Sequence, residues 1–142
     1  MRALLDVNVL IALFDADHSL HSAAMRWLDE NGKAGWATCP ITQNGCMRVM
    51  SQPAYPNAVP VSAIAERLRH AASHPQHEFW PDEVSLLDPS AVDATRVHGA
   101  KQLTDVYLLA LAVARGGRFV TFDRSVSLAA VAGAQKRHLV VI

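Results

Sequence analysis

Short apolar runs alternate with segments of helical pattern along most of this chain, and this alternation limits its fold more than any other feature. Strands are predicted at Ala3–Leu5, Gly35–Thr38, Glu78–Trp80, Arg118–Phe122 and residues 138–142. Helices are expected between them, at residues 7–14, 18–31, 40–50, 61–73, 104–114 and 125–132. Strands that alternate with helices favour a parallel sheet with both faces covered. We therefore predict an α/β fold, a parallel sheet of about five short strands flanked by helices on both faces.

Size and composition indicate one folded domain that spans residues 1–142. Hydrophobic residues make up 51% of the chain and charged residues 18%, which excludes intrinsic disorder. The longest unbroken apolar stretch, Val106–Ala114, is much shorter than the ~20 residues of a membrane span. Asp6 and Asn8 interrupt the apolar start of the chain, so no signal peptide is expected there. We expect a cytoplasmic protein with no membrane partner.

The distribution of charge is more informative than its total. The formal net charge is zero, which excludes a strongly cationic nucleic-acid binder. From residue 96 onward, however, the only acidic residues are Asp105 and Asp123. The basic residues of the same region are Arg96, Lys101, Arg115, Arg118, Arg124, Lys136 and Arg137. The two cysteines match neither a zinc site nor a disulfide framework.

Three aspartates are candidate metal ligands. Asp6 and Asp123 each follow a predicted apolar strand, and the carboxyl ends of strands are where ligands bind in open α/β sheets. If the two strands are neighbours, the carboxylates repel each other unless a cation lies between them. Asp105, in the first turn of a buried helix, can join them from the side. Oxygen ligands alone indicate Mg²⁺, with Mn²⁺ as a substitute, and a Mg²⁺ site suits phosphodiester hydrolysis.

Each aspartate also has a purely structural interpretation. Asp123 can cap the helix predicted after it, and Asp105 can interact only with a helix dipole. Asp6 can be a turn residue beside Asn8. These interpretations account for the residues one at a time but leave their predicted convergence unexplained.

Four segments together resemble the PIN-domain ribonuclease toxins of the VapC family. They are LLDVNVLIAL at the start, ITQNGCMRVMS at residues 41–51, QLTDVYLLALA at residues 102–112 and FVTFDRS at residues 119–125. The resemblance implies a PIN-like fold, a Mg²⁺-dependent endoribonuclease, an RNA substrate, a homodimer and a cognate VapB-type antitoxin. It assigns Asp6, Asp105 and Asp123 to catalysis and metal binding, and Asn8 to a supporting polar role near the substrate.

One position departs from the family motif, because Gln43 stands where Glu is usual. An amide keeps an acceptor oxygen but loses the charge, so the site holds three carboxylates instead of four. Gln43 is retained as a candidate catalytic residue through a water or the substrate, and the alternative is that it bonds only its neighbours. Arg48 and Arg124 are candidate substrate contacts.

Two other functions compete with the nuclease. In the first, the loss of charge at Gln43 leaves a weakened PIN domain that binds RNA or an antitoxin without cutting. In the second, the chain is a phosphotransfer domain of receiver type, which predicts an adjacent acidic pair near the N-terminus and a Lys after a later strand. The sequence shows neither of those features.

Overall fold

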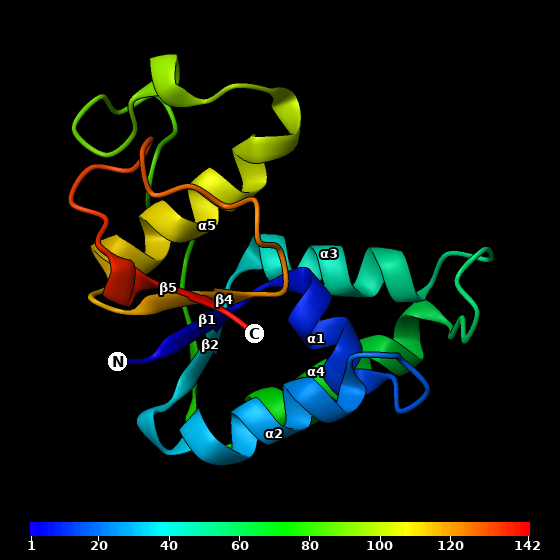
Figure 1. Cartoon of the computed structure of the whole chain (residues 1–142). Coiled ribbons are helices and arrows are strands. Elements are labelled where there is room, and N and C mark those ends of the chain that lie inside the picture. The colour runs from blue at the N-terminus through cyan, green and yellow to red at the C-terminus, as the bar shows by residue number, and fades with distance from the viewer.

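A computed structural model describes residues 1–142 and shows a parallel sheet between two layers of helices (Figure 1). The order of the strands across the sheet is β3-β2-β1-β4-β5, and every pair is parallel. The strands are β1 (Ala3–Leu5), β2 (Trp36–Thr38), β3 (His77–Phe79), β4 (Arg118–Thr121) and β5 (Leu139–Val141). The predicted fold class is confirmed.

Five α-helices surround the sheet. They are α1 (Val7–Phe14), α2 (His21–Asn31), α3 (Pro40–Met50), α4 (Val61–Ala72) and α5 (Leu103–Ala114). Four single 3₁₀ turns accompany them: η1 (Gly32–Ala34), η2 (Ala94–Arg96), η3 (Ala100–Gln102) and η4 (Lys136–His138). None of the helices has the length and apolar character that crossing a membrane requires.

The central strands β1, β2 and β4 are largely buried on both faces, which explains why they are mostly apolar, whereas the edge strand β3 is polar and partly exposed. Leu4 of β1 points into a core shared with α5, whereas Leu5 points into a second core shared with α1 to α4. Phe119 and Val120 divide in the same way on β4. Figure 1 shows α5 on one side of the sheet and α1, α2 and α4 on the other.

The predicted helix at residues 125–132 is wrong. The carboxylate of Asp123 accepts hydrogen bonds from the backbone N–H and the hydroxyl of Ser125, at 2.8 and 2.7 Å, and closes a tight turn instead. Val131 then forms an isolated antiparallel bridge with Val92. Side chains that bond nearby backbone compete with helix formation, and here they prevail.

Two helices begin at other residues than predicted. The N–H of Leu20 donates to Nδ1 of His18 in a turn, and α2 therefore begins only at His21. Thr104 does not cap α5, because α5 begins at Leu103 and Thr104 lies in its first turn. Both differences are small and leave the predicted order of elements unchanged.

Candidate active site

Asp6 and Asp123 lie at the same edge of the sheet. β1 and β4 are neighbours with Leu5 opposite Val120, and the N–H of Asp6 donates to the carbonyl of Val120 at 2.9 Å. Asp6 is only 7% exposed although it carries a carboxylate. The condition for the two carboxylates to approach each other, that their strands are neighbours, is therefore met.

Asp6 also caps α1. One carboxylate oxygen accepts the N–H of Val7 at 2.7 Å, and the other accepts the hydroxyl of Thr121 at 2.6 Å. A carboxylate at a helix N-terminus is stabilised by the unpaired N–H groups and by the helix dipole. The capping role and the position beside Asp123 therefore coexist, and both oxygens of Asp6 are held in place.

Thr121 connects the residues around Asp6, and the sequence analysis missed it. Its buried hydroxyl donates to Asp6 and accepts from the N–H of Asp123 at 3.0 Å and from the side-chain amide of Asn8 at 3.3 Å. The carbonyl of the Asn8 side chain in turn accepts the N–H of Phe122, at 3.4 Å. The available signal was a hydroxyl residue two positions before Asp123, on the last residue of an otherwise apolar strand.

The electrostatic environment of Asp105 includes the charges of the other two aspartates. It lies in the first turn of α5, half-buried, and burial raises its pKa to about 6 with the negative charges of Asp6 and Asp123 adding to the effect. Burial also raises the pKa of Asp6, to which the charge of Asp123 contributes. The hydroxyl and N–H of Ser125 instead hold the pKa of Asp123 below its ordinary value. The charges of Asp6 and Asp123 therefore act on Asp105, and the charge of Asp123 acts on Asp6.

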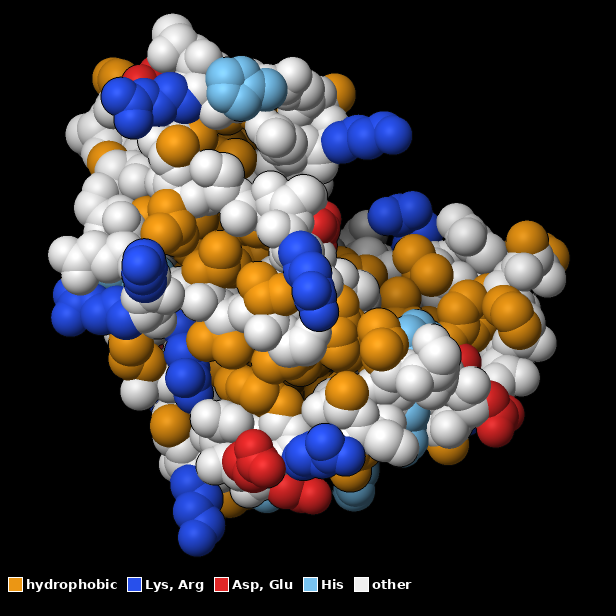
Figure 2. Space-filling view, in the orientation of Figure 1, with side chains coloured by type: hydrophobic (Ala, Val, Ile, Leu, Met, Phe, Trp, Pro, Cys, Tyr) orange, Lys and Arg blue, Asp and Glu red, His pale blue; other side chains and the backbone are white.

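A cavity of about 160 Å³ opens beside two of these acids. Its lining residues are Arg96, Lys101, Gln102, Asp105, Val106, Asp123, Ser125, Val126, Ser127 and Ala130. Figure 2 shows a notch between the part of the molecule that holds α5 and the part that holds α3, with an acidic side chain at its base and Lys or Arg side chains on both sides. Acids and cations thus surround a space of the size of a small polar group.

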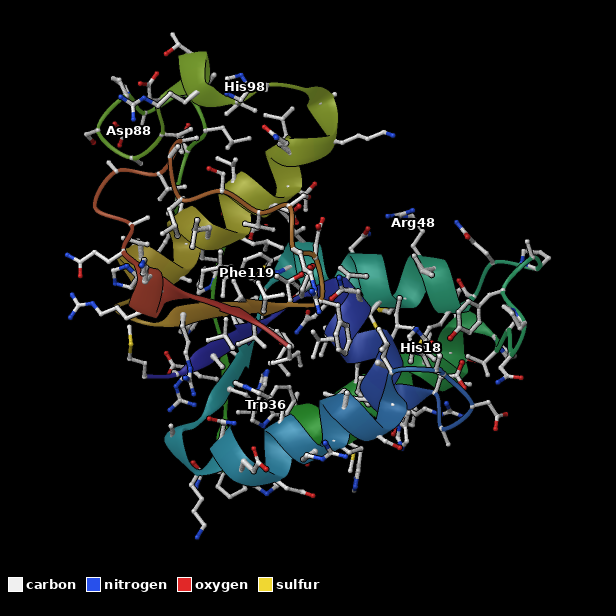
Figure 3. All side chains as sticks on the ribbon, in the orientation of Figure 1. His18, Trp36, Arg48, Asp88, His98 and Phe119 are labelled. Atoms are coloured by element: carbon white, nitrogen blue, oxygen red, sulfur yellow. The ribbon has the colours of Figure 1, made fainter.

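The predicted substrate contacts lie outside this cavity. Arg48 and Arg124 are both exposed and neither lines it. In Figure 3, Arg48 lies on α3, and its side chain extends from the helix toward solvent. Both residues remain predictions as substrate contacts.

Gln43 belongs to a different polar group. Its side-chain N–H donates to the hydroxyl of Thr38 at 3.0 Å, and that hydroxyl lies 2.8 Å from Nε2 of His77. Thr38 ends β2, the strand next to β1, so Gln43 lies near the acids in the sheet but makes no hydrogen bond with them. The sequence motif located this residue without showing which neighbours would hold it.

The residues present fit a divalent cation. No group of three His, Cys, Asp or Glu side chains is arranged to hold a metal ion by itself. Mg²⁺, however, is usually bound through one or two carboxylates and keeps several waters, to which substrate phosphates are added. Burial raises the pKa of Asp105 most, the charges of Asp6 and Asp123 add to it, and a cation would relieve this repulsion; every carboxylate oxygen is also a hard donor.

Comparisons with known proteins identify the family of this chain. The model of the PIN domain family matches residues 3–133. The sequence is 54% identical to "Ribonuclease VapC44" of Mycobacterium tuberculosis over 142 residues, which is 100% of both chains. It is 45% identical to "Ribonuclease VapC39" of the same organism, over 94% of this chain and 96% of the relative.

Solved structures show the same fold at much lower identity. VapC20 of Mycobacterium tuberculosis, described as a sarcin-ricin loop cleaving toxin, matches with a TM-score of 0.61 and 14% identity, over 93% of this chain and 98% of its own. VapBC2 of Rickettsia felis, solved with a fragment of promoter DNA, matches with a TM-score of 0.56 and 13% identity, over 87% and 89%.

Proposed function

The chain belongs to the PIN-domain family, among relatives named VapC ribonucleases, and from this premise we propose that it is a divalent-metal-dependent endoribonuclease, the toxin of a VapBC-type pair. The observation that carries the proposal is geometric: β1 and β4 are neighbours, so Asp6 and Asp123 follow adjacent strands at the carboxyl edge of the sheet, and Asp105 and Asp123 line one cavity there. Burial and the charges of Asp6 and Asp123 raise the pKa of Asp105, and perturbed pKa values cluster at functional sites.

In this mechanism Asp6, Asp105 and Asp123 would hold Mg²⁺, and Mn²⁺ could replace it. When bound, the cation supplies a Lewis acid that binds a phosphate oxygen and lowers the pKa of an attacking water. The chain's own part is orientation. The hydroxyl of Thr121 fixes one oxygen of Asp6, and Ser125 occupies one oxygen of Asp123, which leaves the other oxygen of Asp123 free to face the cavity.

Asp105 is the third acid, and no hydrogen bond contributes to its pKa. Its carboxylate therefore has no protein donor to release before it binds a cation. At a pH well above 6 it is ionised and available as a ligand, whereas below that pH a proton competes for it. We expect cleavage to require an ionised Asp105.

The direct test is cleavage of structured RNA by the purified protein with Mg²⁺, with Mn²⁺ or with EDTA, alongside Asp105→Asn. We expect cleavage with either cation, none with EDTA, and at least a hundredfold loss in the variant. A matched control is Asp88→Asn, which removes an exposed acid from a distant turn. Cleavage that persists in both EDTA and Asp105→Asn would rule out this mechanism.

The proposed partners are an RNA substrate, a VapB-type antitoxin and a second copy of the chain. The relatives' names support the RNA and the antitoxin, since one solved neighbour is a VapBC assembly. Size-exclusion chromatography with light scattering tests the dimer directly. A monomer at all concentrations would contradict the dimer and leave the nuclease proposal standing.

A weakened, non-cutting binding module is the second candidate. Gln43 favours it, because its amide donates to Thr38 and adds no charge to the three acids. Cleavage that appears only in Gln43→Glu would support this candidate, whereas equal cleavage by both proteins would refute it. Binding of RNA is measured in parallel, since the module must retain it.

A further inference from the structure

We propose that Lys101 and Arg96 form a binding site for one backbone phosphate of RNA, directly beside Asp105 and Asp123. The inference rests on the proposed ribonuclease function and names residues that the family motif does not contain. Its basis is the cavity of about 160 Å³, where these two cations face Asp105 and Asp123 across the same space. The hydroxyls of Ser125 and Ser127 line the same cavity and can donate to phosphate oxygens.

Lys101 is the stronger of the two candidates because its charge is free. It is exposed, and no carboxylate lies within 4.0 Å of its ammonium group, although Asp105 follows only four residues later. A lysine that borders two acids without pairing with either is available for a ligand. Its flexible stem lets the ammonium group follow a phosphate as a point charge.

Arg96 is held at the rim of the cavity by weak contacts. Its Nε lies 3.4 Å from a carboxylate oxygen of Asp93, and one of its terminal nitrogens lies 3.5 Å from the carbonyl of Ala129. The side chain remains 62% exposed. Exposed pairs of this kind contribute little energy, so a phosphate can compete for the guanidinium at small cost.

The backbone fixes the wall that carries Arg96. Segments 91–96 and 127–132 are joined by the bridge between Val92 and Val131. Two further backbone hydrogen bonds reinforce it, from Asp93 to Ala130 at 2.8 Å and from Ala132 to Ala91 at 2.9 Å. This wall closes the cavity on one side, so the phosphate site has a fixed position relative to Asp123.

The balance of charge makes phosphate binding depend on the cation. Two acids and two basic groups line the cavity, and Asp6 acts on Asp105 from outside this lining as a further negative charge, so without a cation the acids oppose a phosphodiester. A bound divalent cation adds two positive charges and makes the site attractive to a phosphodiester. RNA affinity should therefore rise with a divalent cation, and Lys101 should matter most when the cation is present.

Two exposed basic residues of the same C-terminal region provide the comparison. Lys136 and Arg137 lie in η4, which precedes β5, and therefore at the opposite edge of the sheet from the acids. They belong to the same excess of basic residues in the sequence but do not line the cavity. A general electrostatic effect would treat Arg137 and Lys101 alike, whereas a built site distinguishes them.

The test measures binding of a fluorescein-labelled single-stranded RNA of mixed sequence by anisotropy, with Ca²⁺ or with EDTA, and a gel confirms that the RNA stays intact. The full-length proteins are wild type, Lys101→Gln, Arg96→Gln, Lys101→Arg and the control Arg137→Gln. With Ca²⁺ we expect Lys101→Gln to raise Kd about five- to tenfold and to reduce the slope of log K against log salt by about 0.7. Arg96→Gln should have a smaller effect, Lys101→Arg should restore affinity, and Arg137→Gln should stay within about twofold of wild type.

Equal Kd and salt slope for Lys101→Gln and Arg137→Gln would overturn the phosphate site, as would a failure of Lys101→Arg to restore affinity. Cleavage assays with Mg²⁺ separate this result from the parent proposal. If wild type cuts RNA and Lys101→Gln cuts it with unchanged KM, only the phosphate site is refuted. If wild type neither cuts nor binds RNA, the proposed function is refuted and the phosphate site with it.

Discussion

Replacing Asp105 with Asn should make the metal-free protein more stable while it removes a residue that catalysis needs. In the folded protein the pKa of Asp105 is about 6 instead of 3.8, because the carboxylate is half-buried and faces the charges of Asp6 and Asp123. The folded state therefore binds a proton more tightly than the unfolded chain does. Ionisation of Asp105 therefore lowers the free energy of unfolding, and the neutral amide of Asn does not have this effect.

The magnitude follows from the same pKa values. A rise from 3.8 to about 6 corresponds to roughly 3 kcal/mol, at about 1.36 kcal/mol for each pKa unit. The side chain is only half-buried, so screening by water reduces the figure to about 2 kcal/mol. An ionised acid in the first turn of α5 also gains roughly 0.3–1 kcal/mol from the helix dipole, which Asn loses. We expect a net gain of about 1–2 kcal/mol from Asp105→Asn at pH 8.

The pH dependence gives the prediction its signature. Between about pH 4 and pH 6 the folded state holds a proton that the unfolded state has released, so the stability of the wild type falls as the pH rises through this window. Above about pH 6 the cost is present in full, and below about pH 4 both states are protonated and it vanishes. The gain from Asp105→Asn should therefore appear at pH 8 and disappear at pH 4.

Urea unfolding in EDTA at both pH values, followed by circular dichroism, measures this difference. The control is Asp88→Asn, because hydrogen bonds from Ser90 lower the pKa of Asp88 and its carboxylate therefore should not destabilise the fold. Added Mg²⁺ should stabilise the wild type more than Asp105→Asn. An Asp105→Asn protein that is no more stable than wild type at pH 8, or that gains equally at pH 4, would refute the reasoning.

Three further predictions concern the packing around the site. Thr121→Val removes the hydroxyl that donates to the buried carboxylate of Asp6, so the free energy of unfolding should fall by roughly 2 kcal/mol at pH 8 and by less in acid. An equal loss at both pH values would show that the hydroxyl does not act through the charge of Asp6. Gly45→Ala places a Cβ about 2.5 Å from a methyl group of Val7, whose side chain is stiff. Urea unfolding should therefore show a free energy of unfolding lower by about 1–2 kcal/mol, despite the better helix propensity of Ala. Unchanged stability would mean that α1 and α3 can move apart without cost. Burial raises the pKa of Cys46 to about 12, so this thiol should react with Ellman's reagent only after unfolding, and rapid reaction of the native protein would contradict its burial.

Much of the architecture was predictable from sequence because its elements have local signals. Most strands are short apolar runs, with the polar edge strand β3 as the exception, and the long helices have a repeating apolar pattern. The wrong prediction of a helix at residues 125–132 also has a local physical cause. Ser125 bonds Asp123 rather than continuing a helix, and the segment that follows consists of turns, with Val131 bridged to Val92.

The candidate site was predictable only in part. Asp6 and Asp123 were expected to approach each other if their strands were neighbours, which they are, and Asp105 lines the same cavity as Asp123. Thr121 was missed because a hydroxyl residue two positions before an aspartate is only a weak signal until the neighbouring strand is known. Its role depends on the pairing of β1 with β4, and these two strands are separated by more than a hundred residues of chain.

The sequence by itself determined which segments are strands, which are helices, and which few acids stand at strand ends, since these properties follow from neighbouring residues. Only the tertiary structure decided that Gln43 donates to Thr38, that Lys101 and Arg96 share a cavity with Asp105 and Asp123, and that Arg48 and Arg124 lie outside it. The reason is that charges and hydrogen bonds act over a few ångströms in space. Those distances are set by the order of the strands in the sheet and not by separation along the chain.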